Sequence, residues 1–135
     1  MRKLWPCVIG LCILCVLSGC SVRKENKDKI KDLDFTVMEK DKVPEELKTM
    51  IEEKKQQPFK VTYADQGWLY IAEGYGAKET SGYSIEVKEC YEAENAVYIH
   101  TNLNGPAKDE KVIEKTTYPY VVVKLEFIDK NVVYK

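Results

Sequence analysis

The sequence predicts an α+β, mostly-β domain: a small antiparallel sandwich or open barrel with one N-terminal amphipathic helix. Two patterns lead to this fold class. One helical periodicity precedes Pro58, and about six segments of alternating apolar and polar residues follow it. A domain of about 100 residues buries roughly 65% of its extended-chain surface, which is enough for one hydrophobic core. No internal repeat divides the chain.

The N-terminal part of this domain contains a short strand and the helix. Phe35 and Val37 alternate with polar neighbours, which favours a strand at residues 35–37. Pro44 is tolerated at a helix start, and the two glutamates after it complement the positive end of the helix dipole. Apolar side chains then recur at helical spacing before two lysines end the helix. These residues are Leu47, Met50 and Ile51, followed by Lys54 and Lys55.

Two strand pairs follow Pro58. Residues 59–63 and 68–73 alternate in polarity, and turn-forming residues separate them. Residues 82–91 and 96–104 form the second predicted pair, around a polar turn. Both pairs are expected to be antiparallel hairpins, because each connection is short.

A charged loop and two further strands complete the predicted domain. Residues 105–116 predict a long loop, and residues 117–128 predict a strand that contains Pro119. Pro119 must lie at a bulge, at the strand start or at an edge, because proline cannot donate a ladder hydrogen bond. Residues 132–134 predict the last, short strand.

The first twenty residues have the pattern of an export signal. Arg2 and Lys3 precede an apolar segment at residues 4–18, which is shorter than the about 20 residues needed to span a bilayer. The segment Leu17–Cys20 reads Leu-Ser-Gly-Cys and resembles a bacterial lipobox. A buried core helix and an uncleaved anchor are the alternatives.

The lipobox resemblance implies that Cys20 becomes the first residue and carries a covalent diacylglycerol, with a further acyl chain on its amine in many bacteria. Each buried methylene contributes about 0.8 kcal/mol, so two or three such chains hold a protein at a membrane. We therefore expect a lipid-anchored protein at the extracytoplasmic face of a bacterial membrane. The lipid bilayer is its expected partner through Cys20.

Three parts of the chain follow from this interpretation. Residues 1–19 are the lipoprotein signal peptide, residues 20–34 are the lipidated cysteine with a flexible charged tether, and residues 35–135 are the β-rich domain. Between residues 21 and 34, nine side chains are charged and three are apolar, so little surface can be buried. Contact of the five bases with anionic headgroups is the alternative, which the four interleaved acids disfavour.

The charge balance excludes one class of partner. The whole chain has a net charge of −1, and removal of Arg2 and Lys3 with the signal peptide leaves 19 bases against 22 acids. Nucleic-acid binding needs a basic footprint, so nucleic acid is not an expected partner. One histidine and scattered acids give no ligand spacing, so we expect no metal and no cofactor beyond the diacylglycerol.

Cys90 and His100 are the candidates for nucleophilic chemistry, because the other cysteines lie in the signal peptide or carry the lipid. A hairpin symmetric about residue 94 would place Cys90 opposite Tyr98, with His100 diagonal to it on the same face. The favoured interpretation is that Cys90 is a small apolar side chain that fills space and that His100 is a surface residue. No orienting acid stands out, so we expect no catalytic residue and no enzyme.

The best candidate for a partner site is the glycine-hinged loop between the two strand pairs. Gly74, Gly76 and Gly82 permit backbone conformations that other residues avoid. Tyr75 and Tyr83 add amphipathic rings of the sort enriched at interfaces. The alternative is that the glycines bend a strand and the tyrosines complete the core. The predicted partner-binding residues of this loop and the neighbouring edge are Gly74, Tyr75, Gly76, Lys78, Thr80, Ser81, Gly82, Tyr83, Tyr118, Pro119 and Tyr120.

Four motifs resemble the C-terminal domain of the protease complex subunit PrcB family. They start at Val43, Tyr70, Thr80 and Tyr118 and read VPEEL, YIAEGYG, TSGYSIEV and YPYVVVK. Ser81 stands where the family pattern Thr-Gly-Gly-Tyr has its first glycine. The resemblance covers approximately residues 43–134. A more distant likeness to chagasin-type inhibitors of cysteine peptidases is confined to the TSGY segment.

The family resemblance implies a class of function. Members are exported bacterial proteins, often lipoproteins, and the namesake subunit accompanies and stabilises a surface subtilisin-like protease. We therefore expect a membrane-anchored protein-binding module that associates with an exported protease and stabilises or restrains it. The alternative is a small-ligand or cell-wall binding lipoprotein without a protease partner. An enzyme acting through Cys90 ranks third.

Overall fold

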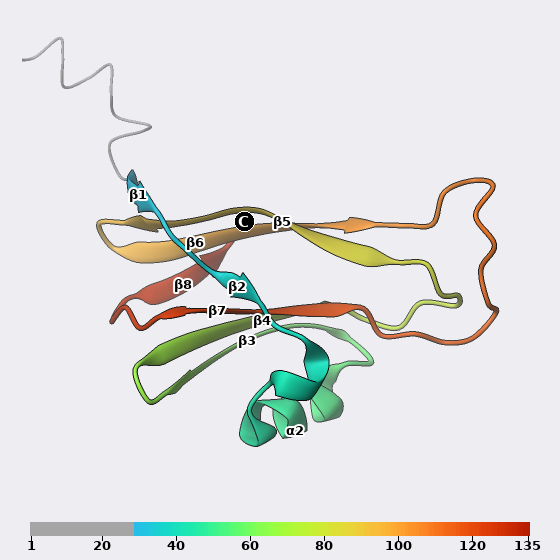
Figure 1. The fold of residues 1–135 in the computed structure, drawn as a ribbon, viewed down its shortest axis with the longest axis horizontal. Coiled ribbons are helices and arrows are strands. Elements are labelled where there is room, and N and C mark those ends of the chain that lie inside the picture. Colours follow the sequence, from blue (N-terminus) through green and yellow to red (C-terminus); the bar gives the residue numbers. More distant parts are fainter. Residues whose placement is uncertain (1–28) are drawn as a thin grey trace, which may run out of the picture.

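The computed structural model describes residues 29–135 (Figure 1). The predicted signal peptide, Cys20 and the first part of the predicted tether lie outside these residues. The helices and strands, in chain order, are β1 (Lys29–Asp32), β2 (Thr36–Val37), the 3-10 helix η1 (Lys40–Lys42), α2 (Glu45–Lys54), β3 (Pro58–Asp65), β4 (Trp68–Tyr75), β5 (Ser84–Ala93), β6 (Ala96–Asn104), β7 (Tyr120–Glu126) and β8 (Asn131–Tyr134).

The described strands form two four-stranded sheets. Sheet A has the order β1-β5-β6-β8, and sheet B has the order β2-β7-β4-β3. Figure 1 shows the two sheets stacked on each other, with α2 on the outer face of sheet B. The predicted mostly-β sandwich with one amphipathic helix is confirmed.

One strand pair departs from the predicted antiparallel arrangement, because β8 pairs parallel with β6. The segment after β7 leaves sheet B and enters sheet A, so no tight hairpin constrains the direction of β8. The other pairs are antiparallel.

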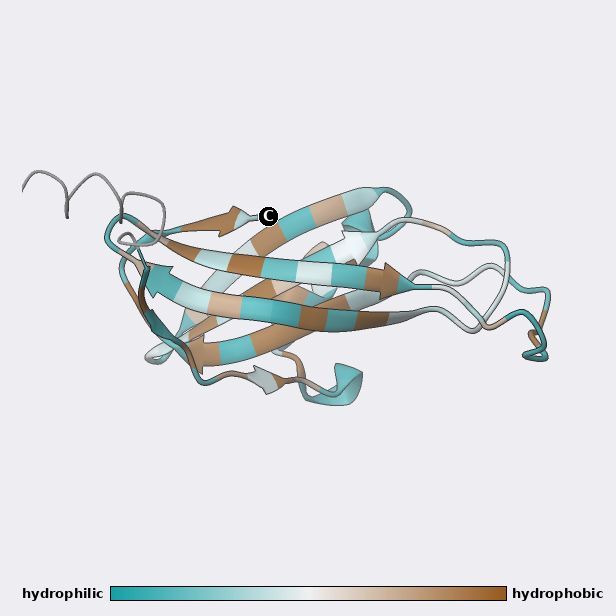
Figure 2. Ribbon diagram, turned by 90° about the horizontal axis from the view of Figure 1, so that it is seen from above, coloured by the Kyte–Doolittle hydropathy of each residue, from teal (hydrophilic) through white to brown (hydrophobic). Residues whose placement is uncertain are grey.

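The central strands of sheet B are buried on both faces. On β4, Leu69 and Ile71 belong to the apolar cluster between the sheets, whereas Tyr70 and Ala72 belong to the cluster beneath α2. The two clusters lie on opposite faces because successive side chains of a strand alternate. Figure 2 shows this alternation of hydrophobic and hydrophilic residues along the strands. The helix therefore turns the sandwich into three packed layers.

Part of the predicted flexible tether is a strand. Lys29–Asp32 form β1 and pair with the end of β5, although all four side chains are exposed. Main-chain hydrogen bonding to a sheet edge does not require apolar side chains, which is why the composition of the segment did not predict it. Leu33 and Phe35 then pack against the cluster between the sheets, and Leu33 N–H donates to the Cys90 carbonyl over 2.9 Å. The tether interpretation is therefore wrong for residues 29–34.

The predicted register of the β5–β6 hairpin is correct only in the half that lies away from the turn. Ile85 pairs with Leu103 and Val87 with Thr101, but Glu89 then pairs with His100, so the register shifts at Lys88. A bulge of one residue exchanges the two faces of the strand beyond it. Beyond the bulge the predicted pairing fails: Cys90 lies opposite Ile99 and not opposite Tyr98.

The chain connections divide the sandwich into two ends. At one end, β1 begins and the turns β3–β4, β5–β6 and β7–β8 gather; we call this the N-terminal end (Figure 1). At the other end lie the β4–β5 and β6–β7 connections, residues 76–83 and 105–119, which we call the loop end. Strands of eight to ten residues, about 30 Å long at 3.3 Å per residue, separate them.

Pro119 directly precedes β7, one of the positions predicted for it. None of the helices within residues 29–135 is long and apolar enough to cross a membrane.

Candidate partner-binding site

Backbone hydrogen bonds join the two loops of the loop end. Lys78 N–H donates to the Thr117 carbonyl over 2.8 Å, and Thr117 N–H donates back over 2.9 Å. The Thr117 hydroxyl adds a bond of 2.7 Å to the Thr80 carbonyl. The two loops therefore form one braced unit, although they lie far apart in the sequence.

Ser81 adds a link from its side chain. Its N–H donates to the Ile113 carbonyl over 3.0 Å, and the Ile113 N–H donates to the Ser81 hydroxyl oxygen over 2.9 Å. Glycine could accept no such bond. The departure from the Thr-Gly-Gly-Tyr pattern thus supplies an acceptor that holds the longer loop.

The first part of the predicted partner site consists of two buried glycines and a half-buried tyrosine. A Cβ atom at Gly74 would lie 2.1 Å from Cε2 of Phe59, so the missing side chain makes room for the aromatic ring. Gly76 is buried and has a φ of +81°, which favours glycine at this turn. Tyr75 is half-buried. These three residues shape the end of β4, and the two glycines offer no exposed surface.

The Tyr75 hydroxyl belongs to a polar network between the sheets. Thr101 on β6 donates its hydroxyl proton to Glu73 Oε1 on β4 over 2.8 Å. Because that hydroxyl has one proton, Tyr75 must donate to Thr101 across the 2.5 Å contact. Glu73 and Thr101 are buried, so this chain of hydrogen bonds satisfies a carboxylate between the two sheets.

The second part of the predicted site comes together around one pocket at the loop end. The pocket has a volume of about 160 Å³ and is lined by residues from three separate segments. The predicted residues of the glycine-hinged loop thus meet those of the segment before β7. The lining residues are Lys40, Ser81, Gly82, Tyr83, Thr117, Tyr118 and Pro119.

Lysine side chains cover the tyrosine rings of this region. Such contacts are favourable because the face of an aromatic ring is electronegative. The distances from Nζ to the ring centroid are 4.2 Å for Lys40 and Tyr120, 4.6 Å for Lys55 and Tyr118, and 5.9 Å for Lys78 and Tyr83.

Sequence reasoning missed Lys40 and Lys55 as members of this site. Lys40 lies in η1 and Lys55 directly follows α2, and no motif connects them with the loops. Partial burial, and then the charge of Lys55, lower the pKa of Lys40. Lys55 itself lies 3.0 Å from a carboxylate oxygen of Glu52. The two lysines therefore approach each other beside the pocket, and only Lys55 has an acidic partner among residues 29–135.

The Cys90 and His100 pair that the sequence raised is not formed. Cys90 is buried in the cluster between the sheets, and burial raises the pKa of its thiol to about 11. His100 lies on the opposite face of its hairpin, with Nδ1 3.6 Å from Glu89 Oε2. A buried thiol with a raised pKa is a poor nucleophile. Within residues 29–135, no group of three His, Cys, Asp or Glu residues is placed to hold a metal ion.

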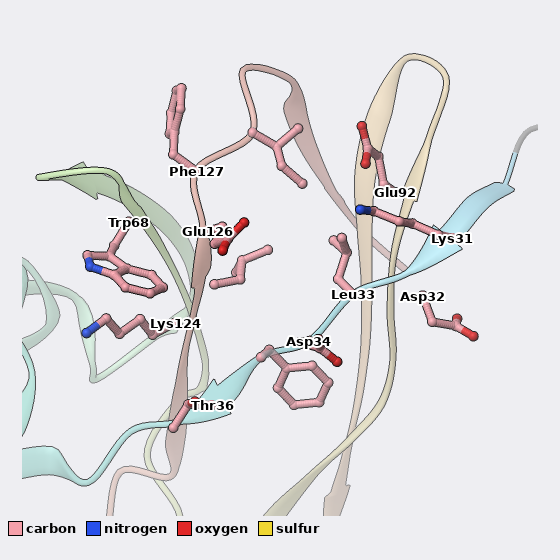
Figure 3. A pocket seen from close by; sticks show the side chains of 13 residues that line it. Lys31, Asp32, Leu33, Asp34, Thr36, Trp68, Glu92, Lys124, Glu126 and Phe127 are labelled. Atoms are coloured by element: carbon pink, nitrogen blue, oxygen red, sulfur yellow. The ribbon is translucent and has the colours of Figure 1, made fainter.

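A larger groove lies at the N-terminal end, and no sequence motif predicted it (Figure 3). Its volume is about 500 Å³, and β1, β2, β4 and β7 contribute to its walls. Trp68 and Phe127 are 39% and 48% exposed there, and Lys124 Nζ lies 4.4 Å from the Trp68 ring centroid. The groove therefore combines exposed aromatic rings with charged side chains.

The comparison with known proteins gives one match. Residues 69–126 match a family model described as PrcB C-terminal. No curated protein and no solved structure matches the chain. The matched segment runs from β4 into β7 and includes both loops of the loop end, and it is narrower than the region over which the sequence motifs resemble the family. This match confirms, over residues 69–126, the PrcB C-terminal resemblance that those motifs predicted.

Proposed function

We propose that this protein is a membrane-anchored binding module that associates with an exported protease and stabilises or restrains it. The single observation that carries the proposal is the position of the braced loop end, which lies at the opposite end of the sandwich from β1 (Figure 1). A chain anchored before β1 would present this end to a partner. The PrcB C-terminal match supports the choice of a protease complex as the setting.

The proposed anchor is a diacylglycerol on Cys20. Eight residues lie between Cys20 and Lys29, and an extended chain covers at most about 3.6 Å per residue, so the reach is about 30 Å. This length would keep the N-terminal end near the membrane surface. The loop end would then lie about one strand length, roughly 30 Å, further from it.

The braced loops suit a binding role for an energetic reason. A partner site on flexible loops must lose conformational entropy when it binds, whereas hydrogen-bonded loops have lost most of it on folding. Tyr83 and Tyr118 present aromatic rings of the kind that contribute strongly to protein interfaces. We propose no catalytic role, and the buried Cys90 takes no part in the function.

Affinity capture from solubilised membranes tests the proposal. We expect full-length protein to enrich an exported protease, and we expect the half-life or activity of that protease to change when the protein is absent. Tyr83→Ala should reduce recovery. Tyr98→Ala is the matched control, because Tyr98 is also half-buried but stacks on Tyr91 on another face. Equal recovery with both variants would place the binding site elsewhere.

The groove at the N-terminal end favours a second candidate function, binding of a small ligand or of cell-wall polymer. Its volume of about 500 Å³ lies in the range of small-molecule sites, and Trp68 and Phe127 offer exposed aromatic faces. Retention of the protein on purified wall polymer, lost in Trp68→Ala and kept in Tyr83→Ala, would support this candidate. Protease capture without such retention would exclude it.

A further inference from the structure

The pocket at the loop end contains a cation that lacks an acidic partner. Lys40 lines the pocket, and it forms no ion pair with any acid among residues 29–135. Its Nζ lies 4.2 Å from the Tyr120 ring centroid, so one side of the ammonium group faces an aromatic ring in place of water. The neighbouring Lys55 is already paired with Glu52. The pocket therefore has an uncompensated positive charge.

Three residues that line the same pocket have main-chain N–H groups without a main-chain acceptor in the described part of the chain. The N–H groups of Gly82, Tyr83 and Tyr118 find no backbone acceptor among residues 29–135, although all three residues line the pocket. The Thr117 hydroxyl already donates to the Thr80 carbonyl. A space of about 160 Å³ is thus lined by one lysine and by residues whose main-chain N–H groups have no main-chain acceptor among the described residues, which suits an acceptor with negative charge.

We propose that this pocket binds the carboxylate of an acidic side chain in the partner protein, with Lys40 as the charged contact. This inference rests on the proposed function and names the chemistry of the partner segment. The carboxylate would replace the hydration that Lys40 loses against Tyr120. It would also offset the repulsion between Lys40 and Lys55, the second cause of the lowered pKa of Lys40.

The aromatic lining of the pocket favours an acidic side chain of a peptide over a polyanion. Tyr83 and Tyr118 flank the charge, and tyrosine rings pack well against a peptide. Glu110 does not line the pocket: its Oε2 lies 3.3 Å from where a Cβ on Gly82 would be, and its Oε1 accepts a hydrogen bond from Ala107 N–H over 3.0 Å.

The test is a titration of the full-length protein in detergent micelles with two peptides. Both peptides are acetylated and amidated, which removes the terminal charges; one alternates glutamate with glycine, and the other alternates glutamine with glycine. We expect the glutamate peptide to shift the amide resonances of Gly82 and Tyr83. The glutamine peptide should bind about 10-fold more weakly, the size expected for loss of one charged hydrogen bond.

Lys40→Gln and Lys124→Gln form a matched pair of variants. Each lysine lies over an aromatic ring, at 4.2 Å from Tyr120 and at 4.4 Å from Trp68, but Lys124 is at the other end of the sandwich. We expect Lys40→Gln to weaken binding of the glutamate peptide about 10-fold and Lys124→Gln to change it less than about two-fold. Circular dichroism of both variants verifies that they are folded.

Failure of the inference is distinguishable from failure of the proposed function. Absence of shifts at Gly82 and Tyr83, equal binding of the two peptides, or equal effects of the two variants overturns the carboxylate pocket. Protease capture that is unaffected by Lys40→Gln overturns the inference and leaves the proposed function standing. Selective peptide binding without any captured protease supports the pocket chemistry and contradicts the protease partner.

Discussion

Ser81 and Ile113 exchange two hydrogen bonds, one from each main-chain N–H, and thereby fasten the two loops of the loop end together. One acceptor is the Ile113 carbonyl, and the other is the Ser81 hydroxyl oxygen. Ile113 is 67% exposed, so hydrogen bonding and not burial holds this part of the longer loop in place. The first prediction follows from this pair.

Ser81→Ala removes the side-chain acceptor and leaves the main chain able to form the other bond. We expect a loss of about 0.5–1.5 kcal/mol in the free energy of unfolding, the usual net contribution of one hydrogen bond. Amide hydrogen exchange at Ile113 should accelerate as well. Ser84→Ala is the control, because Ser84 is exposed and its side chain forms no hydrogen bond among the described residues. Unchanged exchange at Ile113 would contradict the role of Ser81.

Gly74→Ala should destabilise the domain, because the new Cβ would lie 2.1 Å from Cε2 of the buried Phe59 ring. Overpacking of this kind costs about 1–3 kcal/mol in the free energy of unfolding. Chemical denaturation measures the loss, and Phe59→Leu in the same chain should recover part of it. Gly105→Ala is the control, since its Cβ would meet the Tyr83 ring at 3.4 Å. Equal stability of the two alanine variants would disprove the close contact.

Thr101→Val should lower the free energy of unfolding by more than its small change in side-chain shape suggests. It removes both the donor to Glu73 and the acceptor for Tyr75, and it leaves a buried carboxylate without that bond. An unsatisfied buried group costs about 1–3 kcal/mol, and more when it is charged. Tyr75→Phe should cost only about 1 kcal/mol, since Thr101 can still donate to Glu73. Denaturant unfolding measures both losses in the free energy of unfolding. A larger loss for Tyr75→Phe than for Thr101→Val would refute the direction of these hydrogen bonds.

Cys90 should react slowly with alkylating reagents in the folded protein. Burial raises the pKa of its thiol from 9.0 to about 11, which reduces the thiolate fraction about 100-fold at pH 8. The folded state binds this proton more tightly than the unfolded state, so the contribution to stability is complete below pH 9 and falls as pH rises towards 11. Cys90→Ala should remove this part of the pH dependence, measured by denaturation from pH 8 to 11. His100→Ala should leave the alkylation rate unchanged, whereas a slower rate would revive a Cys–His pair.

Cys20→Ala should release the protein from the membrane fraction into the soluble extracytoplasmic fraction, because the lipid is the proposed attachment. Cell fractionation and immunoblotting measure the distribution. Cys90→Ala is the control and should remain with the membrane. Persistence of the Cys20→Ala protein in the membrane fraction would show that another segment holds it there.

Most of the secondary structure could be predicted, because it depends on neighbours along the chain. The helix after Pro44 has its acids, apolar stripe and terminal lysines within eleven residues. The β3–β4 hairpin has its alternation and its turn within one continuous segment. Pro119 is restricted by its own chemistry, so its place at the start of β7 was among the predicted options.

The departures come from how strands pair with each other. The strand β1 exists because the edge of β5 offers hydrogen-bonding groups, and a composition rich in charge gives no sign of that. The bulge at Lys88 moves Cys90 into the core, and the alternation of β5 does not reveal it. Each of these features is decided by pairing with another strand: β5 for β1, and β6 for the bulge.

The features of the candidate site also separate into those that the sequence determined and those that only the tertiary structure decided. The sequence alone determined the mostly-β class, the amphipathic helix, the family and the glycine and tyrosine residues that surround the loops, because each of these depends on residue types at short spacing. Only the tertiary structure decided that Gly74 and Gly76 are buried, that Gly82 and Tyr83 meet Tyr118, and that Lys40 completes the pocket. The physical reason is that local periodicity specifies which face of an element is apolar, whereas the neighbours of that face are chosen when the two sheets and the helix pack together.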